Sequence, residues 1–500
     1  MLTAQDVAVL DANAEALGVP RKQLMESSGN AVARAVRDLA DPGASVAIVA
    51  GRGNNGGDAL VAARFLDGGA PRAPGGRGAE RPDDYDTTVH LLGRASAVGT
   101  DIARENWDAL VEADYDAREV TDATALELGD PDLVVDAMLG TGVSGDLREP
   151  EATAARRMAE SDATVLSVDV PSGVDPDGGA GAANAVTADH IVTFHDTKPG
   201  LADLDADVRV EPIGIPAAAE TFVGPGDLLR LGRDPSSHKG DNGEVLVVGG
   251  GPYTGAPALS AQAALRAGAD LVRVVCPSEV ARELQGYSEN LIVRSFHGER
   301  LTPAHLDTVR ELAEGHDTVV LGPGLGDAAE TLSAAEQLLS TLEGTVVVDA
   351  DALQVVPEVE TRADLLCTPH QGELRKMGGE TVDDPAERAE LVEEFAAALG
   401  HTLLVKGAHD VISDGERTRR NRTGNPGMTV GGTGDVLAGA CGALASVLDT
   451  HDAASVAAFA NGRAGDIVVE EYGNGLVATD LVDALPRAMR RPDEDIAGGA

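Results

Sequence analysis

Short runs of β-branched residues alternate with alanine-rich stretches along nearly the whole chain. This alternation is typical of βαβ units, in which a helix connects two parallel strands of one sheet. In the first half the expected strands are residues 45–50, 88–92, 133–139, 164–170, 190–194 and 208–213. In the second half they are residues 244–249, 271–276, 291–296, 318–321, 345–349, 365–368 and 403–406. The sequence therefore predicts an α/β protein with parallel sheets.

One interruption of this pattern divides the chain, where the polar segment GRDPSS occupies residues 232–237. The length of 500 residues is about twice what one hydrophobic core usually supports. We therefore expect two domains, residues 1–232 and residues 238–490. Residues 68–86, rich in Gly, Pro and Arg, are expected to form a surface loop, and residues 491–500 a disordered tail.

The charge of the chain is strongly one-sided, with 83 acidic and 39 basic residues, a net charge of −44 and a pI near 4.4. Such a surface repels nucleic acid and anionic membranes, so neither is an expected partner. The acidic residues are spread over the whole sequence, lysine occurs five times, and aromatic residues make up 2%. This composition favours a halophilic, haloarchaeal protein over an ordinary acidic mesophilic one.

Salt dependence distinguishes these two interpretations. In molar salt the repulsion between acidic groups is screened, because the Debye length is about 3 Å at 1 M and about 30 Å at 0.01 M. We therefore expect the unfolding temperature to fall when KCl is lowered from molar to millimolar concentration, as measured by circular dichroism. A chain that is equally stable at both concentrations would contradict the halophilic interpretation.

The cysteines and the apolar segments indicate a cytoplasmic protein. Cys276, Cys367 and Cys441 are odd in number, lack the spacing of metal ligands and lie in apolar runs, as buried thiols in a reducing compartment do. The N-terminus lacks the pattern of a signal peptide. The longest apolar run, at residues 438–448, is too short to span a bilayer.

Parallel sheets bind ligands at the carboxyl ends of their strands, and four segments of the first half follow expected strands. They are GRGNNGGD (51–58), DAMLGTGVSGD (136–146), DVPSGVD (169–175) and TFHDTKPG (193–200). Two glycine-rich loops on one sheet suit the two phosphates of a dinucleotide. Asn55, Asp136 and Ser172 offer hard oxygen ligands for an alkali or alkaline-earth cation. Lys198, in a chain that avoids lysine, is either a functional residue or half of a buried ion pair.

These four segments, in this order and spacing, resemble the NAD(P)H-hydrate epimerase domain over residues 1 to about 225. The resemblance implies a Rossmann-like three-layer sandwich that interconverts the R and S epimers of hydrated NAD(P)H. It implies Asn55, Asp136 and Ser172 as K⁺ ligands and Asp169 as the acid/base residue. The implied substrate loops are Asn54, Asn55, Gly56, Gly57 and Asp58, then Gly140, Thr141, Gly142, Val143, Ser144, Gly145 and Asp146. The family often has Trp where this chain has Val174.

In the second half, glycine-rich or polar segments again follow expected strands and should share one cleft. They are GGGPYTGAP (249–257), LGPGLG (321–326), VDADAL (348–353) and TPHQGE (368–373). His370 is either a ligand contact or a core histidine, and the sequence around it favours a ligand contact. Gly431 to Gly434 form an anion nest at a helix start, with Asp435 in the first turn. This arrangement suits phosphoryl transfer with a carboxylate that accepts the proton of the attacking hydroxyl.

These segments, together with HKGDNG (238–243), KGAHD (406–410) and GNPGMTVGGTGD (424–435), resemble the ADP-dependent NAD(P)H-hydrate dehydratase. The resemblance covers residues 238 to about 487 and implies a ribokinase-like three-layer sandwich. It implies phosphorylation of the C6 hydroxyl of the S epimer and loss of phosphate, with AMP as the other product, Asp435 as base and Mg²⁺ beside the nucleotide. The implied substrate contacts are Ala256, Gly324, His370 and Asp435. The implied nucleotide contacts are Lys406, Gly407, Ala408, His409, Asp410 and Gly434.

The two halves together resemble the bifunctional NAD(P)H-hydrate repair enzymes, whose two reactions are consecutive. The expected substrates are the hydrated cofactors NADHX and NADPHX with ADP, and a homo-oligomer is expected. ADP rather than ATP follows from the prokaryotic family resemblance. One alternative is a ribokinase-like small-molecule kinase, which would leave the first half unexplained. Another makes the first half a non-catalytic scaffold, which would tolerate Asp169→Ala, whereas an epimerase would lose R-to-S conversion.

Overall fold

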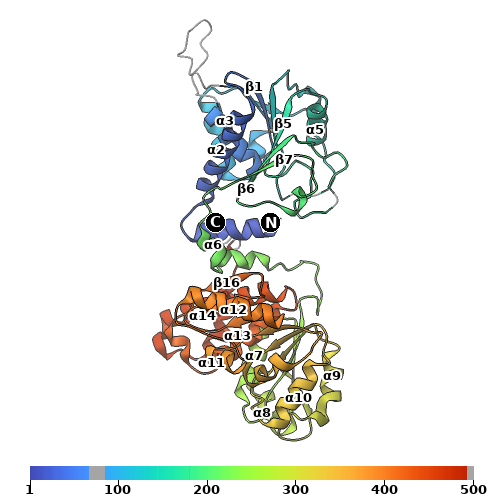
Figure 1. The fold of residues 1–500 in the computed structure, drawn as a ribbon, viewed down its shortest axis with the longest axis vertical. Helices are drawn as coiled ribbons and strands as arrows, with labels where there is room; N and C mark the ends of the chain where they lie inside the picture. The colour runs from blue at the N-terminus through green and yellow to red at the C-terminus, as the bar shows by residue number, and fades with distance from the viewer. Residues whose placement is uncertain (67–84, 143–144, 180, 493–500) are drawn as a thin grey trace. The chain divides into compact units, whose positions relative to one another are not determined.

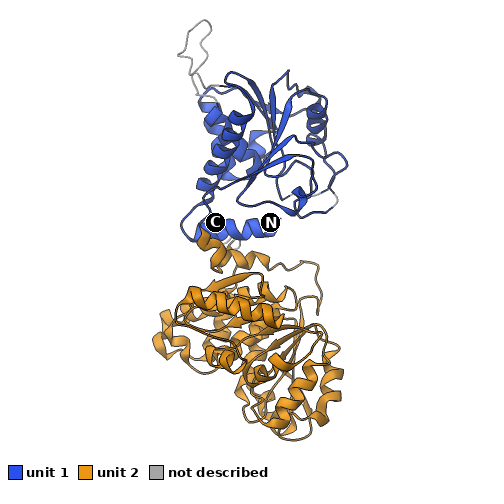
Figure 2. Cartoon of the chain, viewed as in Figure 1, with its two compact units in different colours: residues 1–216 blue, residues 217–500 orange. Residues whose placement is uncertain are grey.

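The computed structural model describes residues 1–66, 85–142, 145–179 and 181–492. These residues form two compact units, residues 1–216 and residues 217–500 (Figure 2). Most of the loop expected at 68–86 and of the tail expected at 491–500 lies outside the described residues, as do Val143 and Ser144.

Unit 1 contains a seven-stranded sheet of order β3-β2-β1-β4-β5-β6-β7 in which all neighbours are parallel. The strands are β1 (Ser45–Ala50), β2 (Asp86–Leu92), β3 (Ala117–Val120), β4 (Leu133–Ala137), β5 (Thr164–Val168), β6 (His190–Phe194) and β7 (Asp207–Glu211). The helices are α1 (Ala4–Ala16), α2 (Arg21–Leu39), α3 (Asn54–Leu66), α4 (Asp101–Glu112) and α5 (Glu151–Ala159), with 3₁₀ turns η1 (Ala95–Ala97), η2 (Ala123–Ala125) and η3 (Pro199–Leu201). The order of β1 to β6 is that of dinucleotide-binding sheets, and it reverses direction between β1 and β4.

Helices cover both faces of this sheet, so unit 1 has three layers (Figure 1). On one face, Ala154 and Met158 of α5 pack with Ala47 and Val49 of β1. On the other face α3 packs against β1, β2 and β4 and is joined by α2. A Cβ at Gly29 would lie 2.4 Å from the side chain of Val61, so a glycine is required where α2 crosses α3.

Unit 2 contains a nine-stranded sheet of order β10-β9-β8-β11-β12-β13-β14-β15-β16. Its strands are β8 (Glu244–Val248), β9 (Leu271–Pro277), β10 (Ile292–Phe296), β11 (Thr318–Leu321), β12 (Thr345–Val348), β13 (Asp364–Cys367), β14 (Thr402–Val405), β15 (Asp410–Ser413) and β16 (Thr418–Asn421). The strands from β8 to β14 pair in parallel, and β15 and β16 add an antiparallel edge.

The helices of unit 2 also lie on both faces of its sheet. They are α6 (Ala217–Thr221), α7 (Gly255–Arg266), α8 (Ser278–Tyr287), α9 (Leu306–Ala313), α10 (Ala329–Leu339), α11 (Gln371–Lys376), α12 (Pro385–Leu399), α13 (Thr433–Leu444), α14 (Thr450–Tyr472) and α15 (Ala478–Ala488). The 3₁₀ turns are η4 (Pro225–Arg230), η5 (Pro303–His305), η6 (Ala350–Glu358), η7 (Pro426–Thr429) and η8 (Gly473–Gly475). Val245 and Val247 enter the core beneath α7, α13 and α14, and Leu246 and Val248 enter the core beneath α9, α10 and α12. The α/β class and the layered sheets are confirmed.

All thirteen expected strands are present, each within two residues of the expected ends. Three further strands, β3, β15 and β16, were not expected. β3 (AREV) and β16 (TRRN) lie at the edges of their sheets and carry polar side chains, so they lack the apolar run of a buried strand. β15 (DVIS) begins with a charged residue and has only two apolar residues, so it also lacks a continuous apolar run.

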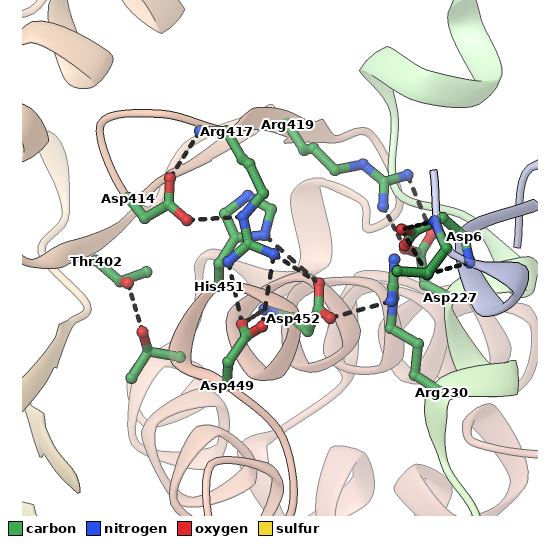
Figure 3. A network of polar contacts seen from close by, with 12 residues as sticks. Asp6, Asp227, Arg230, Thr402, Asp414, Arg417, Arg419, Asp449, His451 and Asp452 are labelled. Atoms are coloured by element: carbon green, nitrogen blue, oxygen red, sulfur yellow. Dashed lines mark hydrogen bonds and ion pairs between the residues drawn. The ribbon is translucent and has the colours of Figure 1, made fainter. Parts of the chain in front are cut away.

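The structure divides the chain after Pro216, earlier than the boundary expected at 232–237. The reason is that α6 and η4 pack on unit 2. Val223 donates a backbone hydrogen bond to Arg420, and Val223 and Leu228 belong to the core of unit 2. Arg419 pairs with the buried Asp227, and Arg230 pairs with Asp452 at 3.1 Å (Figure 3).

The three cysteines are free and buried. Burial raises the pKa of the Cys276 and Cys367 thiols to about 12, so both stay protonated at neutral pH. In the described part of the chain, no helix combines the length and the apolar character that crossing a bilayer requires.

Candidate active sites

The first site lies at the carboxyl ends of β1, β4, β5 and β6, and Asp136 is fully buried in it. Its carboxylate accepts hydrogen bonds from the Ser172 hydroxyl at 2.6 Å, the Ser172 amide at 2.9 Å and the Ser167 hydroxyl at 2.9 Å. Complete burial raises the pKa of Asp136, and these hydrogen bonds oppose the rise. The hydrogen bonds fix Asp136 and Ser172 as one rigid unit.

Asn55, in the first turn of α3, joins this unit through the backbone of Leu139. Its Nδ2 donates to the Leu139 carbonyl at 2.9 Å, and the Leu139 amide donates to Ser172 Oγ at 3.0 Å. Asn55 Oδ1 is buried and has no hydrogen-bond partner among the described residues. The structure thus brings Asn55, Asp136 and Ser172 together. Their oxygens are hard ligands, and an unpartnered buried amide oxygen fits a cation such as K⁺.

Asp169 and Lys198 form a buried ion pair beside this unit. Lys198 is 1% exposed, and its Nζ donates to Asp169 Oδ1 at 2.6 Å, to Thr193 Oγ1 at 2.7 Å and to the Phe194 carbonyl at 3.0 Å. All three ammonium protons are therefore used, and the carboxylate is held in one place. Asp169 is 14% exposed, so it remains open to a ligand.

Backbone strain marks the ends of β5 and β6. Among the described residues, four non-glycine residues have a left-handed φ, including Asp169 (+64°) and His195 (+68°). A third, Ala350 (+56°), lies at the end of β12 in unit 2. Such backbone costs about 1–3 kcal/mol per residue and clusters at functional sites. The turn at Asp169 ends β5 two residues earlier than expected, and Asp169 and Thr193 are held together by a hydrogen bond.

Two further carboxylates interact electrostatically with Asp169. Burial, together with repulsion from Asp169, raises the pKa of Asp11 to about 6, although Arg21 opposes the rise. Burial, followed by repulsion from Asp169 and Asp11, raises the pKa of Asp58 well above its usual range. The site thus holds two further carboxyl groups that keep their protons to a higher pH than an exposed aspartate does.

The described residues of the expected substrate loops follow β1 and β4, at the same end of the sheet as this site. Residues 54–58 form the first turn of α3, and a Cβ at Gly56 would lie 2.1 Å from the Gly51 carbonyl oxygen, so the turn needs a glycine there. Gly140 packs against Asn55. Asp146 accepts a hydrogen bond from the Ala183 amide at 3.3 Å and is exposed.

The second site lies at the carboxyl ends of β12, β13 and β14 and at the start of α13. Lys406 Nζ donates to Asp349 Oδ1 at 2.9 Å and lies 3.9 Å from Glu373 Oε2. Thr368 Oγ1 donates to the same Asp349 oxygen at 2.7 Å. Burial works against the charge of Lys406, but Asp349 and Glu373 outweigh it and raise the pKa of Lys406.

Asp435 is half-buried in the first turn of α13 and belongs to this charge cluster. Burial, together with repulsion from Asp349 and Glu373, raises its pKa to about 7, although Lys406 opposes the rise. A carboxyl group with this pKa can accept a proton near neutral pH and hold it. A Cβ at Gly434 would lie 3.3 Å from Lys406 Nζ, so the expected nucleotide residues Lys406 and Gly434 meet beside Asp435.

His370 stands at the start of α11 with a fixed ring. Its Nδ1 accepts hydrogen bonds from the amides of Gly372 at 2.8 Å and Glu373 at 3.2 Å, and Glu373 accepts from the His370 amide at 2.8 Å. Because Nδ1 accepts, the proton of the neutral ring is on Nε2. The side chain is 59% exposed, so His370 is not a core histidine.

The loops after β8 and β11 complete this edge of the sheet. Gly250 donates its amide to the Pro323 carbonyl at 2.9 Å, and a Cβ at Gly324 would lie 2.6 Å from the Tyr253 carbonyl oxygen. This packing brings Gly324 close to the start of α7, which includes Ala256. Ser260 of α7 in turn donates to the Asp435 carbonyl at 2.8 Å.

The segment 406–410 forms a turn between β14 and β15. Asp410 accepts hydrogen bonds from the Gly407 amide and from Asn421, and Arg388 donates to the His409 carbonyl at 3.2 Å. Gly407, Ala408 and His409 are exposed. By contrast, the segment HKGDNG (238–243) precedes β8 and therefore lies at the amino ends of the strands, opposite the site. There Asp270 accepts hydrogen bonds from the amides of Gly240 at 3.0 Å and Asn242 at 3.1 Å.

Comparisons with known proteins agree with this division. The family model described as NAD(P)H-hydrate dehydratase matches residues 245–487, and the model described as YjeF-related protein N-terminus matches residues 21–200. The bifunctional NAD(P)H-hydrate repair enzyme Nnr of Methanothermobacter thermautotrophicus is 43% identical, over 97% of this chain and 94% of that protein. The enzyme of the same name from Archaeoglobus fulgidus is 42% identical, over 98% of both chains. The chain belongs to the family of bifunctional NAD(P)H-hydrate repair enzymes.

A solved structure of the ADP/ATP-dependent NAD(P)H-hydrate dehydratase from Bacillus subtilis, co-crystallised with ATP and Mg²⁺, is 26% identical with a TM-score of 0.47. The match covers 54% of this chain and 97% of the Bacillus subtilis chain. The repair-enzyme relatives, in contrast, extend over both units of this chain.

Several residues of these sites were not singled out from the sequence. Asp349 and Glu373 lie in segments that were recognised, but their pairing with Lys406 depends on the adjacency of β12, β13 and β14. Asp11 lies on α1, before the first recognised segment, and the sequence carries no signal for it. Thr193 lies in a recognised segment, and an inward-facing polar residue in an apolar strand is a signal that could have identified it.

Proposed function

We propose that this chain catalyses both steps of NAD(P)H-hydrate repair, epimerisation in unit 1 and nucleotide-dependent dehydration in unit 2. The observation that carries the proposal is the presence of two separate carboxylate–lysine sites in one chain, Asp169 with Lys198 and Asp435 with Lys406. Each site lies at the carboxyl ends of the strands of its own sheet, which is where parallel sheets bind ligands. The family of the chain joins these two reactions, and each site supplies the acid–base group that its reaction needs.

In unit 1, epimerisation requires the hydroxyl at C6 to leave and water to add to the other face of the ring. Asp169 is the proposed proton-transfer group for both directions, because it is held by Lys198 and is still exposed to a ligand. Lys198 is a positioning residue. The amides at the start of α3 and the loop at 140–146 are proposed to hold the substrate phosphates.

Asn55, Asp136 and Ser172 are the proposed K⁺ ligands. A bound K⁺ would supply a fixed positive charge beside the substrate. The fit rests on the buried, unpartnered Asn55 Oδ1 and on the rigid Asp136–Ser172 unit.

Dependence on K⁺ tests this assignment. With KCl replaced by choline chloride at constant ionic strength, we expect epimerisation to decline, because choline is too large for a site of this kind. Asn55→Ala should raise the K⁺ concentration for half-maximal rate by about tenfold or more, since it removes one ligand. The rate of R-to-S conversion against KCl concentration measures both effects. A wild-type rate that does not depend on K⁺ would contradict the assignment.

In unit 2, the C6 hydroxyl of the S epimer is proposed to attack the terminal phosphoryl group of ADP. Asp435 accepts the hydroxyl proton, and the amides at 431–434 and Lys406 stabilise the negative charge of the phosphoryl group in transfer. AMP leaves first. Phosphate then leaves C6 and a proton leaves the neighbouring carbon, which restores the ring double bond of NAD(P)H. Mg²⁺ would neutralise the nucleotide phosphates when bound.

His370, Ala256 and Gly324 are the proposed contacts to the hydrated ring and its attached groups. His370 Nε2 is a donor on an exposed ring whose tautomer is fixed by α11. Lys406, Gly407, Ala408, His409, Asp410 and Gly434 are the proposed nucleotide contacts. ADP as donor, a homo-oligomeric assembly, a cytoplasmic location and a halophilic source are parts of the same proposal.

One assay tests the combined function. The full chain is incubated in molar KCl with Mg²⁺ and a mixture of R and S NADHX, with either ADP or ATP, and NADH is followed by its absorbance. Complete recovery of NADH supports both activities and identifies the donor. Recovery that stops when the S epimer is exhausted contradicts the epimerase, and no recovery with either nucleotide contradicts the dehydratase.

A further inference from the structure

Arg52 and Arg94 follow the neighbouring strands β1 and β2 at their carboxyl ends, and neither has been assigned a role above. Arg52 follows β1, and Arg94 follows β2 after Gly93. The aliphatic part of Arg52 lies over Gly93, because a Cβ there would be 3.1 Å from Arg52 Cδ and 3.4 Å from its Nε. The Gly99 amide donates to the Arg52 carbonyl at 2.9 Å, which ties the two strand-end loops together.

Neither guanidinium has a partner within the part of the chain that the structure describes, and both side chains are exposed. By contrast, most other arginines in the described part of unit 1 form ion pairs or hydrogen bonds. The loops themselves, GRGNNGG (51–57) and GRASAVGT (93–100), contain no acidic residue. The two loops thus carry two positive charges and no negative charge of their own, with Glu119 of β3 bonded to the Ala95 amide. Unpaired guanidinium groups of this kind attract an anion.

The loop that carries Arg94 is rigid. Arg104 of α4 donates to the carbonyls of Ala95, Ser96 and Val98, and Glu119 of β3 accepts the Ala95 amide at 2.9 Å. Rigid loops bind with a smaller loss of conformational entropy. The two free guanidinium groups are therefore presented by a fixed backbone.

The strand order decides which part of the substrate reaches them. A dinucleotide crosses the sheet edge where the order reverses, between β1 and β4. The reacting ring belongs on the side of Asp169 and Lys198, at the ends of β5 and β6, and the phosphates at the start of α3. The adenosine half is then directed to β1 and β2. In dinucleotide sheets, a carboxylate in this region binds the ribose 2′-hydroxyl, whereas an arginine accommodates a 2′-phosphate.

We propose that Arg52 and Arg94 form a subsite for the 2′-phosphate of the adenosine ribose, so that unit 1 prefers NADPHX to NADHX. The inference rests on the proposed epimerase function of unit 1 and names its substrate preference. Arginine–phosphate hydrogen bonds are charge-assisted and can be bidentate. Arginines that contacted the shared pyrophosphate instead would affect both hydrated cofactors equally.

The test compares Arg52→Gln, Arg94→Gln and the double variant of the full chain with both substrates. We expect the KM for R-NADPHX to rise about tenfold or more in each single variant and further in the double variant, with kcat nearly unchanged. R-NADHX should be epimerised at the wild-type KM. Arg157→Gln removes the same charge from the exposed side of α5 and should change neither substrate. Equal effects on both substrates, or no effect on either, overturn the proposal.

A binding measurement separates failure of this proposal from failure of the epimerase function. Titration calorimetry with 2′,5′-ADP and with 5′-AMP reports the phosphate subsite without catalysis. Weaker binding of 2′,5′-ADP to the double variant than to the wild type, with unchanged binding of 5′-AMP, supports the subsite even if no epimerisation is observed. Identical binding of 2′,5′-ADP to both proteins overturns it.

Discussion

Asp435→Asn is expected to reduce dehydration of the S epimer by a factor of about 10² to 10⁴, the usual contribution of a general base. Asn has nearly the same shape as Asp but cannot accept the hydroxyl proton. The phosphoryl acceptor would then stay protonated, and transfer from ADP would become slow. NADH formation from purified S-NADHX with ADP and Mg²⁺ measures the loss. R-to-S conversion by the same variant should remain at the wild-type rate, because it takes place in unit 1.

The pH dependence of the wild type provides an independent sign of this role. Burial, with repulsion from Asp349 and Glu373, raises the pKa of Asp435 to about 7. A base must be unprotonated, so kcat/KM for dehydration should fall about tenfold per pH unit below that pH and level off above it. A kcat/KM that is independent of pH between 5 and 8, or an Asp435→Asn variant with wild-type activity, would exclude Asp435 as the base.

The same pKa shift predicts a change in stability. A raised folded-state pKa means that the protonated carboxyl favours the folded state below about pH 4, and that this contribution is lost as the pH rises towards 7. Above pH 7 the charged Asp435 therefore destabilises the fold. Asp435→Asn should consequently unfold at a higher temperature than the wild type at pH 8, while the two proteins should differ less at pH 4. Thermal unfolding at the two pH values measures this difference, with Asp351→Asn at the same sheet edge as a matched control.

The strands and the order of the recognised segments were predictable because buried parallel strands are continuous apolar runs and their ligand loops need glycine. The first glycine-rich loop and the start of α13 follow directly from that pattern. The edge strands β3 (AREV) and β16 (TRRN) were not predictable, because most of their residues are polar and neither contains an apolar run. The unit boundary was missed since residues 217–231 carry no regular pattern, and their place is set by contacts such as that of Arg419 with Asp227.

Within the sites, residue types were predictable and their partners were not. Lys198 was recognised as unusual in a lysine-poor chain, but the choice between a functional residue and a buried ion pair depended on the fold. The structure shows that the ion pair is itself part of the site, because the partner is Asp169. Asp11 could not have been found from the sequence. It interacts electrostatically with Asp169 only because the fold brings α1 into the same unit as β5.

The ion pair of Asp169 and Lys198 yields the second large effect. Asp169→Asn is expected to abolish R-to-S conversion and also to destabilise unit 1 by about 3–5 kcal/mol, because it leaves the buried Lys198 without its counter-charge. Lys198→Met should cause a similar loss of stability, because it leaves a carboxylate without its cation. Both variants should still dehydrate purified S-NADHX, which unit 2 carries out.

The double variant Asp169→Asn/Lys198→Met separates loss of chemistry from loss of folding. It removes both buried charges together, so we expect it to recover most of the stability that either single variant loses. Epimerisation should stay absent, because no proton-transfer group has been restored. Denaturant unfolding measures the first effect and chiral separation of R- and S-NADHX the second. Recovery of epimerisation together with stability would mean that the ion pair is structural. The proton would then be transferred by another group of the site, such as Asp58 or Asp11, whose pKa values Asp169 raises.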